Sequence, residues 1–138
     1  MFFPLNEPNK HWVLAELNLR TGLVNLYDTL GVVSGRGTHW WRSFKRALKA
    51  QITEYLDQHG ILAMKGIVAK EYKITYRCPA VPRQADIHGD CGIWVCIILY
   101  RLCHNQPLEF DDALQTALAY REQMLQYFWE HKHPVLKD

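Results

Sequence analysis

A cysteine flanked by glycines and an aspartate opens a strongly apolar stretch, in the run Gly89-Asp90-Cys91-Gly92. If that stretch is a helix, Cys91 lies in its first turn, where the positive end of the helix dipole and free backbone N–H groups favour thiolate over thiol. The two glycines carry no side chain that would keep a substrate backbone away. This setting predicts a nucleophilic cysteine.

A thiolate nucleophile needs a base and a group that stabilises oxyanion charge. His11 enters the first strand of a predicted hairpin and Asp28 leaves the second, so the two can lie close together although 17 positions separate them (28 − 11 = 17). The carboxylate would then fix the imidazole tautomer and stabilise the imidazolium. Gln84, in the loop before Cys91, can donate its side-chain amide and form an oxyanion hole together with the Cys91 backbone N–H.

Each of these residues also has a plain structural explanation. A histidine at a strand edge and an aspartate after a strand are often structural, and Asp90 suits a helix cap better than a catalytic role. His88 is a rival base because it is close to Cys91 in the sequence. The residues alone therefore indicate a possible thiol enzyme and leave these alternatives open.

The other three cysteines lack the setting of Cys91. Cys96 and Cys103 fall inside the apolar stretch, where we expect small buried packing residues. No Cys-x-x-Cys pair occurs, so a structural zinc site has little support. Without a predicted secretory signal, cysteines in a chain of this size favour free thiols in a reducing compartment.

Two strands joined by a turn must position the histidine and the aspartate. Residues 12–19 alternate in part between apolar and polar side chains, Arg20-Thr21-Gly22 supplies a turn, and residues 23–28 form the second strand. A glycine-rich loop follows, and from Trp40 the hydrophobic period becomes that of an amphipathic helix, with Thr38 as its N-cap and Gly60 as its stop. The expected apolar face consists of Trp41, Phe44, Leu48, Ile52 and Tyr55. The basic side chains Arg42, Lys45, Arg46 and Lys49 are interpreted as a solvated face.

The second half of the chain must position Cys91. Residues 67–78 predict a strand, and residues 79–82 break regular structure. The helix that begins at Cys91 is apolar on every side, which is typical of a helix buried in the centre of a domain. A last amphipathic helix over about 112–131 has Asp111 as its expected N-cap. Its expected apolar stripe consists of Leu114, Ala117, Leu118, Leu125 and Phe128.

Together these elements predict an α+β fold: a mixed, mainly antiparallel sheet packed against the buried Cys91 helix, with two amphipathic helices outside. The 138 residues suit a single domain over 1–138. The net charge of +2 is too small to imply a nucleic-acid partner by itself. The longest apolar stretch, residues 93–100, is far shorter than the roughly 20 residues that span a bilayer, so no membrane span is expected.

Four blocks of the sequence resemble the ubiquitin-like-protein protease family (Ulp/SENP, the SUMO-specific cysteine proteases). The blocks are Lys10-His11-Trp12-Val13-Leu14, Val24-Asn25-Leu26-Tyr27-Asp28-Thr29-Leu30, Pro82-Arg83-Gln84 and Gly89-Asp90-Cys91-Gly92-Ile93-Trp94-Val95-Cys96. The family order of histidine, aspartate, glutamine and cysteine is kept, in matching local contexts.

The resemblance implies a papain-like cysteine protease fold of the Ulp/adenain type and a thiol protease with His11, Asp28, Gln84 and Cys91 as catalytic residues. Such proteases cleave after the Gly-Gly terminus of a ubiquitin-like modifier, maturing it or releasing it from a lysine side chain. Trp12 would help to form a narrow tunnel for the two glycines; as a plain alternative, it packs beside the sheet. The resemblance further implies no cofactor and no metal, a ubiquitin-like modifier or its conjugates as partner, and a place in the nucleus, the cytoplasm or both.

The sequence departs from the family pattern in two places. The gap from Gln84 to Cys91 is 7 positions (91 − 84 = 7), one residue longer than in the best-known SUMO proteases. Family catalytic domains also carry an upstream segment with modifier contacts, for which we expect no counterpart here. A second hypothesis is therefore a protease-fold relic that binds a modifier without turnover. A third, nucleic-acid binding through the basic face of residues 42–49, would show as salt-dependent DNA binding.

Overall fold

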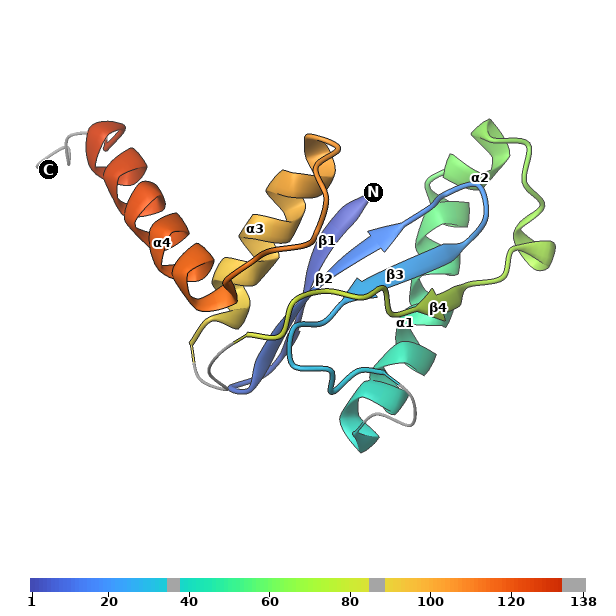
Figure 1. The fold of residues 1–138 in the computed structure, drawn as a ribbon. Coiled ribbons are helices and arrows are strands. Elements are labelled where there is room, and N and C mark those ends of the chain that lie inside the picture. Colours follow the sequence, from blue (N-terminus) through green and yellow to red (C-terminus); the bar gives the residue numbers. More distant parts are fainter. Residues whose placement is uncertain (35–37, 85–88, 133–138) are drawn as a thin grey trace, which may run out of the picture.

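A four-stranded sheet forms the centre of the computed structural model, which describes residues 1–34, 38–84 and 89–132 (Figure 1). The strands lie side by side in chain order. They are β1 (Phe2–Glu7), β2 (His11–Leu17), β3 (Leu23–Tyr27) and β4 (Thr75–Arg77). The first two pairings are antiparallel and β3 pairs with β4 in parallel, so the predicted mixed, mainly antiparallel sheet is confirmed.

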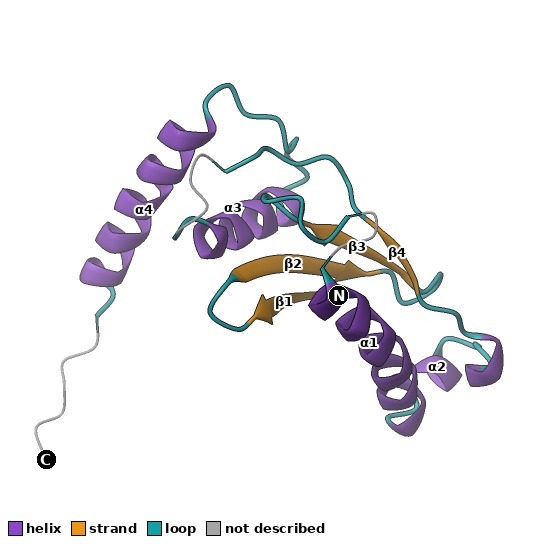
Figure 2. Ribbon diagram, turned by 90° about the horizontal axis from the view of Figure 1, so that it is seen from below, coloured by secondary structure: helices purple, strands orange, loops and turns teal. Residues whose placement is uncertain are grey.

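The helices lie on both sides of this sheet. They are α1 (His39–Gln58), the short α2 (Ile61–Met64), the one-turn 3₁₀ helix η1 (Ala69–Glu71), α3 (Cys91–Cys103) and α4 (Ala113–Glu130). Figure 2 shows α1 on one side of the strands and α3 on the other. The predicted α+β class is therefore confirmed.

The hairpin between β2 and β3 depends on the turn at Gly22. Its φ of +71° lies in the left-handed region that favours glycine. A Cβ atom at this position would come within 2.3 Å of the Lys73 carbonyl oxygen, so the turn also lets the chain before β4 approach closely. The Gly22 carbonyl in turn accepts the Thr75 N–H at 3.0 Å, which aligns β4 beside β3.

Alternation along β2 divides the core between the two sides of the sheet. Val13 and Ala15 belong to the cluster that includes Trp41 and Leu56 of α1, whereas Leu14 packs with Trp94 of α3. This is the two-residue period of a strand that is buried on both faces. The predicted N-cap of α1 is confirmed, since the Thr38 hydroxyl accepts the Trp41 N–H.

One strand was missed, and two expectations for the chain between these elements were wrong. The outer strand β1, residues 2–7, was not expected, since Pro4 and Pro8 obscure its pattern. Only residues 75–77 of the strand expected at 67–78 pair with the sheet, because η1 interrupts the first part of this segment. The N-cap of α4 is Asp112, whose side chain accepts the Gln115 N–H, and not Asp111.

The apolar stripe expected on α4 is largely exposed. Only Ala117 of this stripe is buried, and Leu125 is 74% exposed. In Figure 1, α4 diverges from α3 toward its C-terminal end, so no described helix or strand lies beside its outer turns in that view. The burial expected for two α3 cysteines was also wrong, because Cys96 is half-buried and Cys103 is exposed.

Truncation of Leu26 tests the core on the α1 side. Leu26 is fully buried in β3, so we expect Leu26→Ala to lower the free energy of unfolding by about 2–5 kcal/mol, the usual cost of a core cavity. Urea unfolding measures the change. The control Met64→Ala, at a residue that is 84% exposed, should stay within about 0.5 kcal/mol of the parent. Equal losses in the two variants would contradict this packing.

Candidate active site

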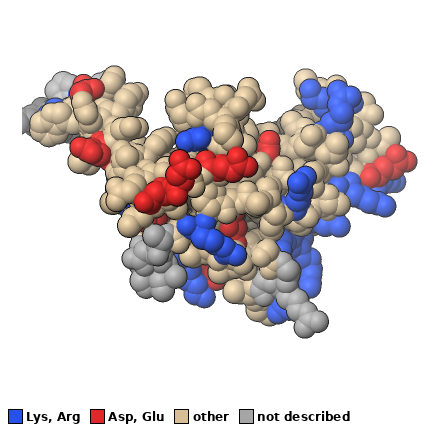
Figure 3. Space-filling model, in the orientation of Figure 1, with Lys and Arg blue, Asp and Glu red and all other residues tan. Residues whose placement is uncertain are grey.

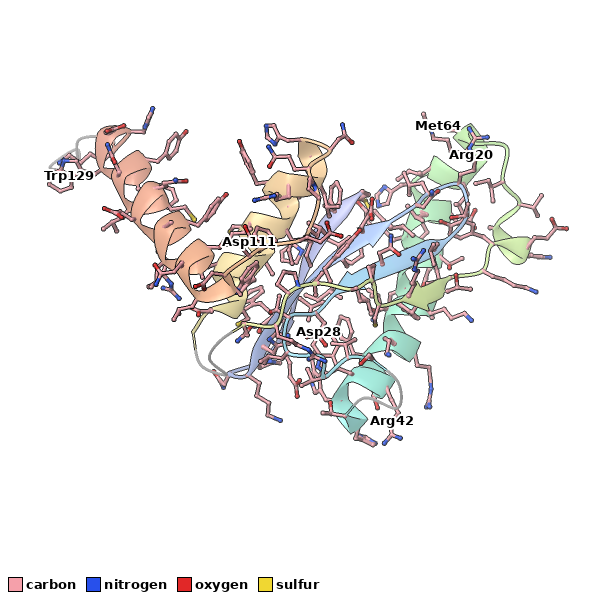
Figure 4. The ribbon with its side chains drawn as sticks, in the orientation of Figure 1. Arg20, Asp28, Arg42, Met64, Asp111 and Trp129 are labelled. Carbon is pink, nitrogen blue, oxygen red and sulfur yellow. The ribbon has the colours of Figure 1, made fainter. Side chains whose placement is uncertain are left out.

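The structure brings His11 and Asp28 into direct contact. His11 is the first residue of β2, and Asp28 follows the last residue of β3 (Figure 4). Because these strands are antiparallel neighbours, the start of one lies beside the end of the other. Nε2 of His11 lies 2.8 Å from Oδ1 of Asp28, and both side chains are buried.

Backbone donors complete the surroundings of the Asp28 carboxylate. Oδ1 also accepts the Leu30 N–H at 3.0 Å, and Oδ2 accepts the Val33 N–H at 2.7 Å. Burial acts to raise the pKa of Asp28, but the hydrogen bonds from His11, Val33 and Gly31 outweigh it and hold this pKa below the ordinary value. Asp28 is therefore ionised at neutral pH.

The ionised carboxylate fixes the tautomer of the histidine. A carboxylate without a proton can only accept a hydrogen bond, so Nε2 of His11 carries the proton in their contact. Nδ1 is left as the nitrogen with the free electron pair. Nδ1 is buried and has no hydrogen-bond partner among the described residues. The geometry thus leaves one basic nitrogen of His11 available to take a proton.

Cys91 lies at the first position of α3, as the sequence predicts, and its side chain is buried. It faces a pocket of about 410 Å³ that lies between the β1–β2 turn and the start of α3. The described residues that line this pocket are Asn6, Asn9, Lys10, His11, Trp12, Gly89, Cys91 and Gly92. Histidine and cysteine therefore share one cavity, with the exposed Trp12 beside them.

Gln84 is held by Thr29, the residue that follows Asp28. Its side-chain oxygen accepts the Thr29 hydroxyl at 2.7 Å, and its backbone N–H donates to the Thr29 carbonyl at 3.2 Å. These contacts set the direction in which the buried amide group faces. Among the described residues that line the cysteine pocket, Gln84 is absent. The structure thus places this residue beside Thr29, the neighbour of Asp28 in the sequence.

Two charged residues beside the site escaped sequence reasoning. Glu7 is buried, is the cross-strand partner of His11 and forms an ion pair with the exposed Lys10 at 3.2 Å. Arg121 of α4 contacts Asp90 at 2.7 Å. Asp90 is the N-cap residue of α3, as expected, but its side chain makes no capping hydrogen bond. The rival base His88 lies outside the described residues.

Other kinds of site find little support in the part of the chain that the structure describes. No group of three or more His, Cys, Asp or Glu side chains there is placed to hold a metal ion. No described helix has the length and hydrophobicity needed to span a bilayer. Lys and Arg side chains gather mainly over the half of the molecule that carries α1 and α2 (Figure 3), where Arg42, Arg46 and Lys49 are exposed. Nucleic-acid binding by this face was only the third hypothesis and stays untested.

A buried histidine–aspartate pair and a cysteine at a helix start, sharing one pocket beside a mixed sheet, define a candidate cysteine protease domain. The model of the Ulp1 protease family, C-terminal catalytic domain, matches residues 1–133. The chain therefore belongs to the Ulp1 protease family. A search of the curated proteins found no match.

Solved structures of Ulp1 share the fold. One is the SUMO protease Ulp1 with its catalytic cysteine oxidised to a sulfonic acid, at 22% identity and a TM-score of 0.58, over 87% of this chain and 48% of that one. Another is the C-terminal Ulp1 protease domain in complex with Smt3, the yeast orthologue of SUMO, at 21% identity and a TM-score of 0.56, over 91% of this chain and 51% of that one. This chain thus spans about half the length of these domains.

The lowered pKa of Asp28 predicts how stability depends on pH. Folding stabilises the ionised form of Asp28, so its pKa is lower in the folded state than the ordinary value of 3.8. The resulting contribution of Asp28 to the free energy of unfolding is complete above the ordinary value and is lost as the pH falls through the folded-state pKa. We expect the free energy of unfolding to decrease once the pH is lowered past about 4. Asp28→Asn should weaken this dependence and should cost about 1–3 kcal/mol at pH 7, because an amide NH₂ group cannot accept a backbone N–H.

Urea unfolding of both proteins between pH 3 and 7 measures this dependence. Asp111→Asn is the matched control, since that carboxylate lies exposed in the loop before α4 (Figure 4). The free energy of unfolding of Asp111→Asn should depend on pH in the same way as that of the parent. An Asp28→Asn variant with the parent's full acid dependence would contradict the assignment.

Proposed function

We propose that this chain is a cysteine-type peptidase or isopeptidase that cleaves after the Gly-Gly terminus of a ubiquitin-like modifier of the SUMO type. One observation carries the proposal. The Nε2 atom of His11 is bound to the buried Asp28 carboxylate, which leaves the basic Nδ1 atom in the imidazole that shares a pocket with Cys91. A base oriented by a carboxylate next to a thiol at a helix N-terminus is the arrangement that activates a sulfur nucleophile.

In the proposed reaction, Nδ1 of His11 takes the proton from the Cys91 thiol. The negative charge then lies on the sulfur at the positive end of the α3 dipole, and the imidazolium is stabilised by Asp28. The thiolate attacks the carbonyl carbon of the second glycine. A carbon–sulfur bond forms, the carbon–nitrogen bond breaks, and His11 returns its proton to the leaving amine. Water then hydrolyses the thioester, releasing the modifier with a free carboxylate.

Charge on the carbonyl oxygen requires donors during this attack. We assign that role to the Cys91 backbone N–H and the Gln84 side-chain amide. The first turn of α3 supports the former, because N–H groups at a helix start have no partner within the helix. The Thr29 hydroxyl supports the latter, because it binds the amide oxygen and so fixes the side on which the NH₂ group lies.

The substrate class rests on the shape of the site as well as on family membership. Gly89 and Gly92 border the pocket without side chains, and the exposed Trp12 borders it with a large flat one. Such walls suit an extended glycine tail, which has no side chains to accommodate. One solved relative is bound to Smt3. On the family resemblance alone, the proposal includes a location in the nucleus, the cytoplasm or both.

A modifier-binding module without turnover is the second candidate. One observation favours it: the chain corresponds to only about half of the matched Ulp1 domains. The remaining half of those domains has no counterpart in the matched residues. If contacts needed for productive substrate binding lie there, the site described above would react with small reagents but would not process a modifier.

Variants of the pair in the pocket test the proposal. A panel of ubiquitin-like modifiers with C-terminal thiol-reactive groups is incubated with the protein, and adducts are located by mass spectrometry. We expect an adduct on Cys91 with one modifier class, none in Cys91→Ser, and a rate lower by about 10²–10⁴-fold in His11→Ala, which lacks the base. Cys103→Ser, at an exposed cysteine outside the pocket, is the control and should react as the parent does.

The remaining outcomes separate the two candidates. A folded protein whose Cys91 is alkylated by iodoacetamide but forms no adduct with any modifier would contradict the protease proposal. Modifier binding without an adduct would favour the binding module. An adduct that persists in Cys91→Ser would show that another residue is the nucleophile.

A further inference from the structure

One guanidinium group connects α4 to the residues that directly precede the nucleophile. Nη2 of Arg121 donates to the Gly89 carbonyl oxygen at 2.7 Å and also contacts Oδ1 of Asp90 at 2.7 Å. Gly89 and Asp90 are 31 to 32 positions away from this arginine in the sequence, so the contact is tertiary and not part of a local turn. Both partners lie within two residues of Cys91.

These contacts fix the backbone at the entry to α3. Gly89 adopts a φ of +96°, which lies in the range that favours glycine, and Asp90 follows with helical dihedral angles. The Asp90 carbonyl accepts the Trp94 N–H at 2.9 Å, which begins the helical ladder. Arg121 therefore holds the Gly89 carbonyl and the Asp90 side chain, and the helix holds the Asp90 carbonyl. The peptide that carries the Cys91 N–H is left little freedom to rotate.

We propose that Arg121 is a positioning residue, which sets the direction of the Cys91 backbone N–H toward the oxyanion through its two contacts with Gly89 and Asp90. This inference rests on the proposed function, since it concerns the oxyanion site of the same cysteine. The hydrogen bonds are charge-assisted and therefore stronger than neutral ones. An oxyanion donor must lie within a few tenths of an ångström of its position, so a small rotation of this peptide would reduce the rate.

The alternative is that Arg121 only attaches α4 to the rest of the molecule. Most of α4 is exposed, and an ion pair that is partly open to solvent contributes little to stability. The two readings differ in what they predict. A mere attachment affects stability, whereas a positioning role affects the step in which the oxyanion forms. Arg121 is absent from the described lining of the Cys91 pocket, so its loss should leave substrate affinity unchanged.

Two small reagents separate these effects without any modifier. With p-nitrophenyl acetate, the Cys91 thiolate attacks a carbonyl carbon, the carbon–sulfur bond forms through an oxyanion, and nitrophenolate leaves. With iodoacetamide, the thiolate displaces iodide from a CH₂ group and no oxyanion forms. Both rates are read on the peptide that contains Cys91 by mass spectrometry. We expect Arg121→Met to slow acetylation about tenfold while alkylation changes less than twofold.

Further variants define the route of the effect. Arg121→Lys keeps the charge but loses the fixed guanidinium geometry, so we expect an intermediate acetylation rate. The double variant Asp90→Ala/Arg121→Met should lose little more than Arg121→Met alone, because both changes break the same contact. Glu122→Gln, at the exposed neighbour on α4, is the matched control and should retain the parent's rates. If the parent turns over a modifier substrate, Arg121→Met should lower kcat and leave KM unchanged.

The inference would be overturned if Arg121→Met slowed acetylation and alkylation of Cys91 equally, or if its acetylation rate stayed within twofold of the parent's rate. It would also be overturned if the lower acetylation rate were explained entirely by the fraction of Arg121→Met protein that is unfolded. A parent protein whose Cys91 has no acetylation advantage over the exposed Cys103 would also overturn it, because there would be no oxyanion site to position. Failure of the proposed function is distinct. In that case Cys91 of the parent is acetylated by p-nitrophenyl acetate as described, but the parent processes no modifier.

Discussion

The buried contact between the His11 imidazole and the Asp28 carboxylate is the constraint on which the rest of the structure depends. A carboxylate removed from water is costly unless each oxygen finds a donor. Here the donors come from a ring on the neighbouring strand and from two backbone N–H groups in the loop that leads to α1. The end of the hairpin and the beginning of that loop are therefore fixed together. A sheet in which β2 and β3 were not neighbours would leave this charge without its histidine partner.

The nucleophile comes from a different layer of the fold. Cys91 belongs to α3, which packs on Leu14 and Tyr27 through Trp94, while α1 covers the other face of the same strands. The site lies at one end of the sheet, where the start of β2 meets the start of α3. His11 is paired with Glu7 of β1, so the base is held by the sheet and the sulfur by the helix. Neither side chain depends on a long loop for its position.

Local patterns explain what the sequence predicted and what it missed. Hairpin logic was enough to bring His11 next to Asp28, and the abrupt change to apolar residues located the start of α3. The exposed face of α4 could not be foreseen, because an amphipathic period reports an apolar stripe but not whether a partner covers it. The contact of Arg121 with Asp90 has no local signature either, since a charged pair 31 positions apart follows only from the tertiary fold.

Both outer strands of the sheet are poor templates for a further strand. In β1 the residue paired with Leu14 is Pro4, which has no N–H to offer to another chain, and β4 is only three residues long. A ladder between two molecules would therefore lack one hydrogen bond at β1 and would be short at β4. A small domain with a largely apolar core is in this way protected against one of the main routes to ordered aggregates, edge-to-edge polymerisation, by a single imino acid and a short strand.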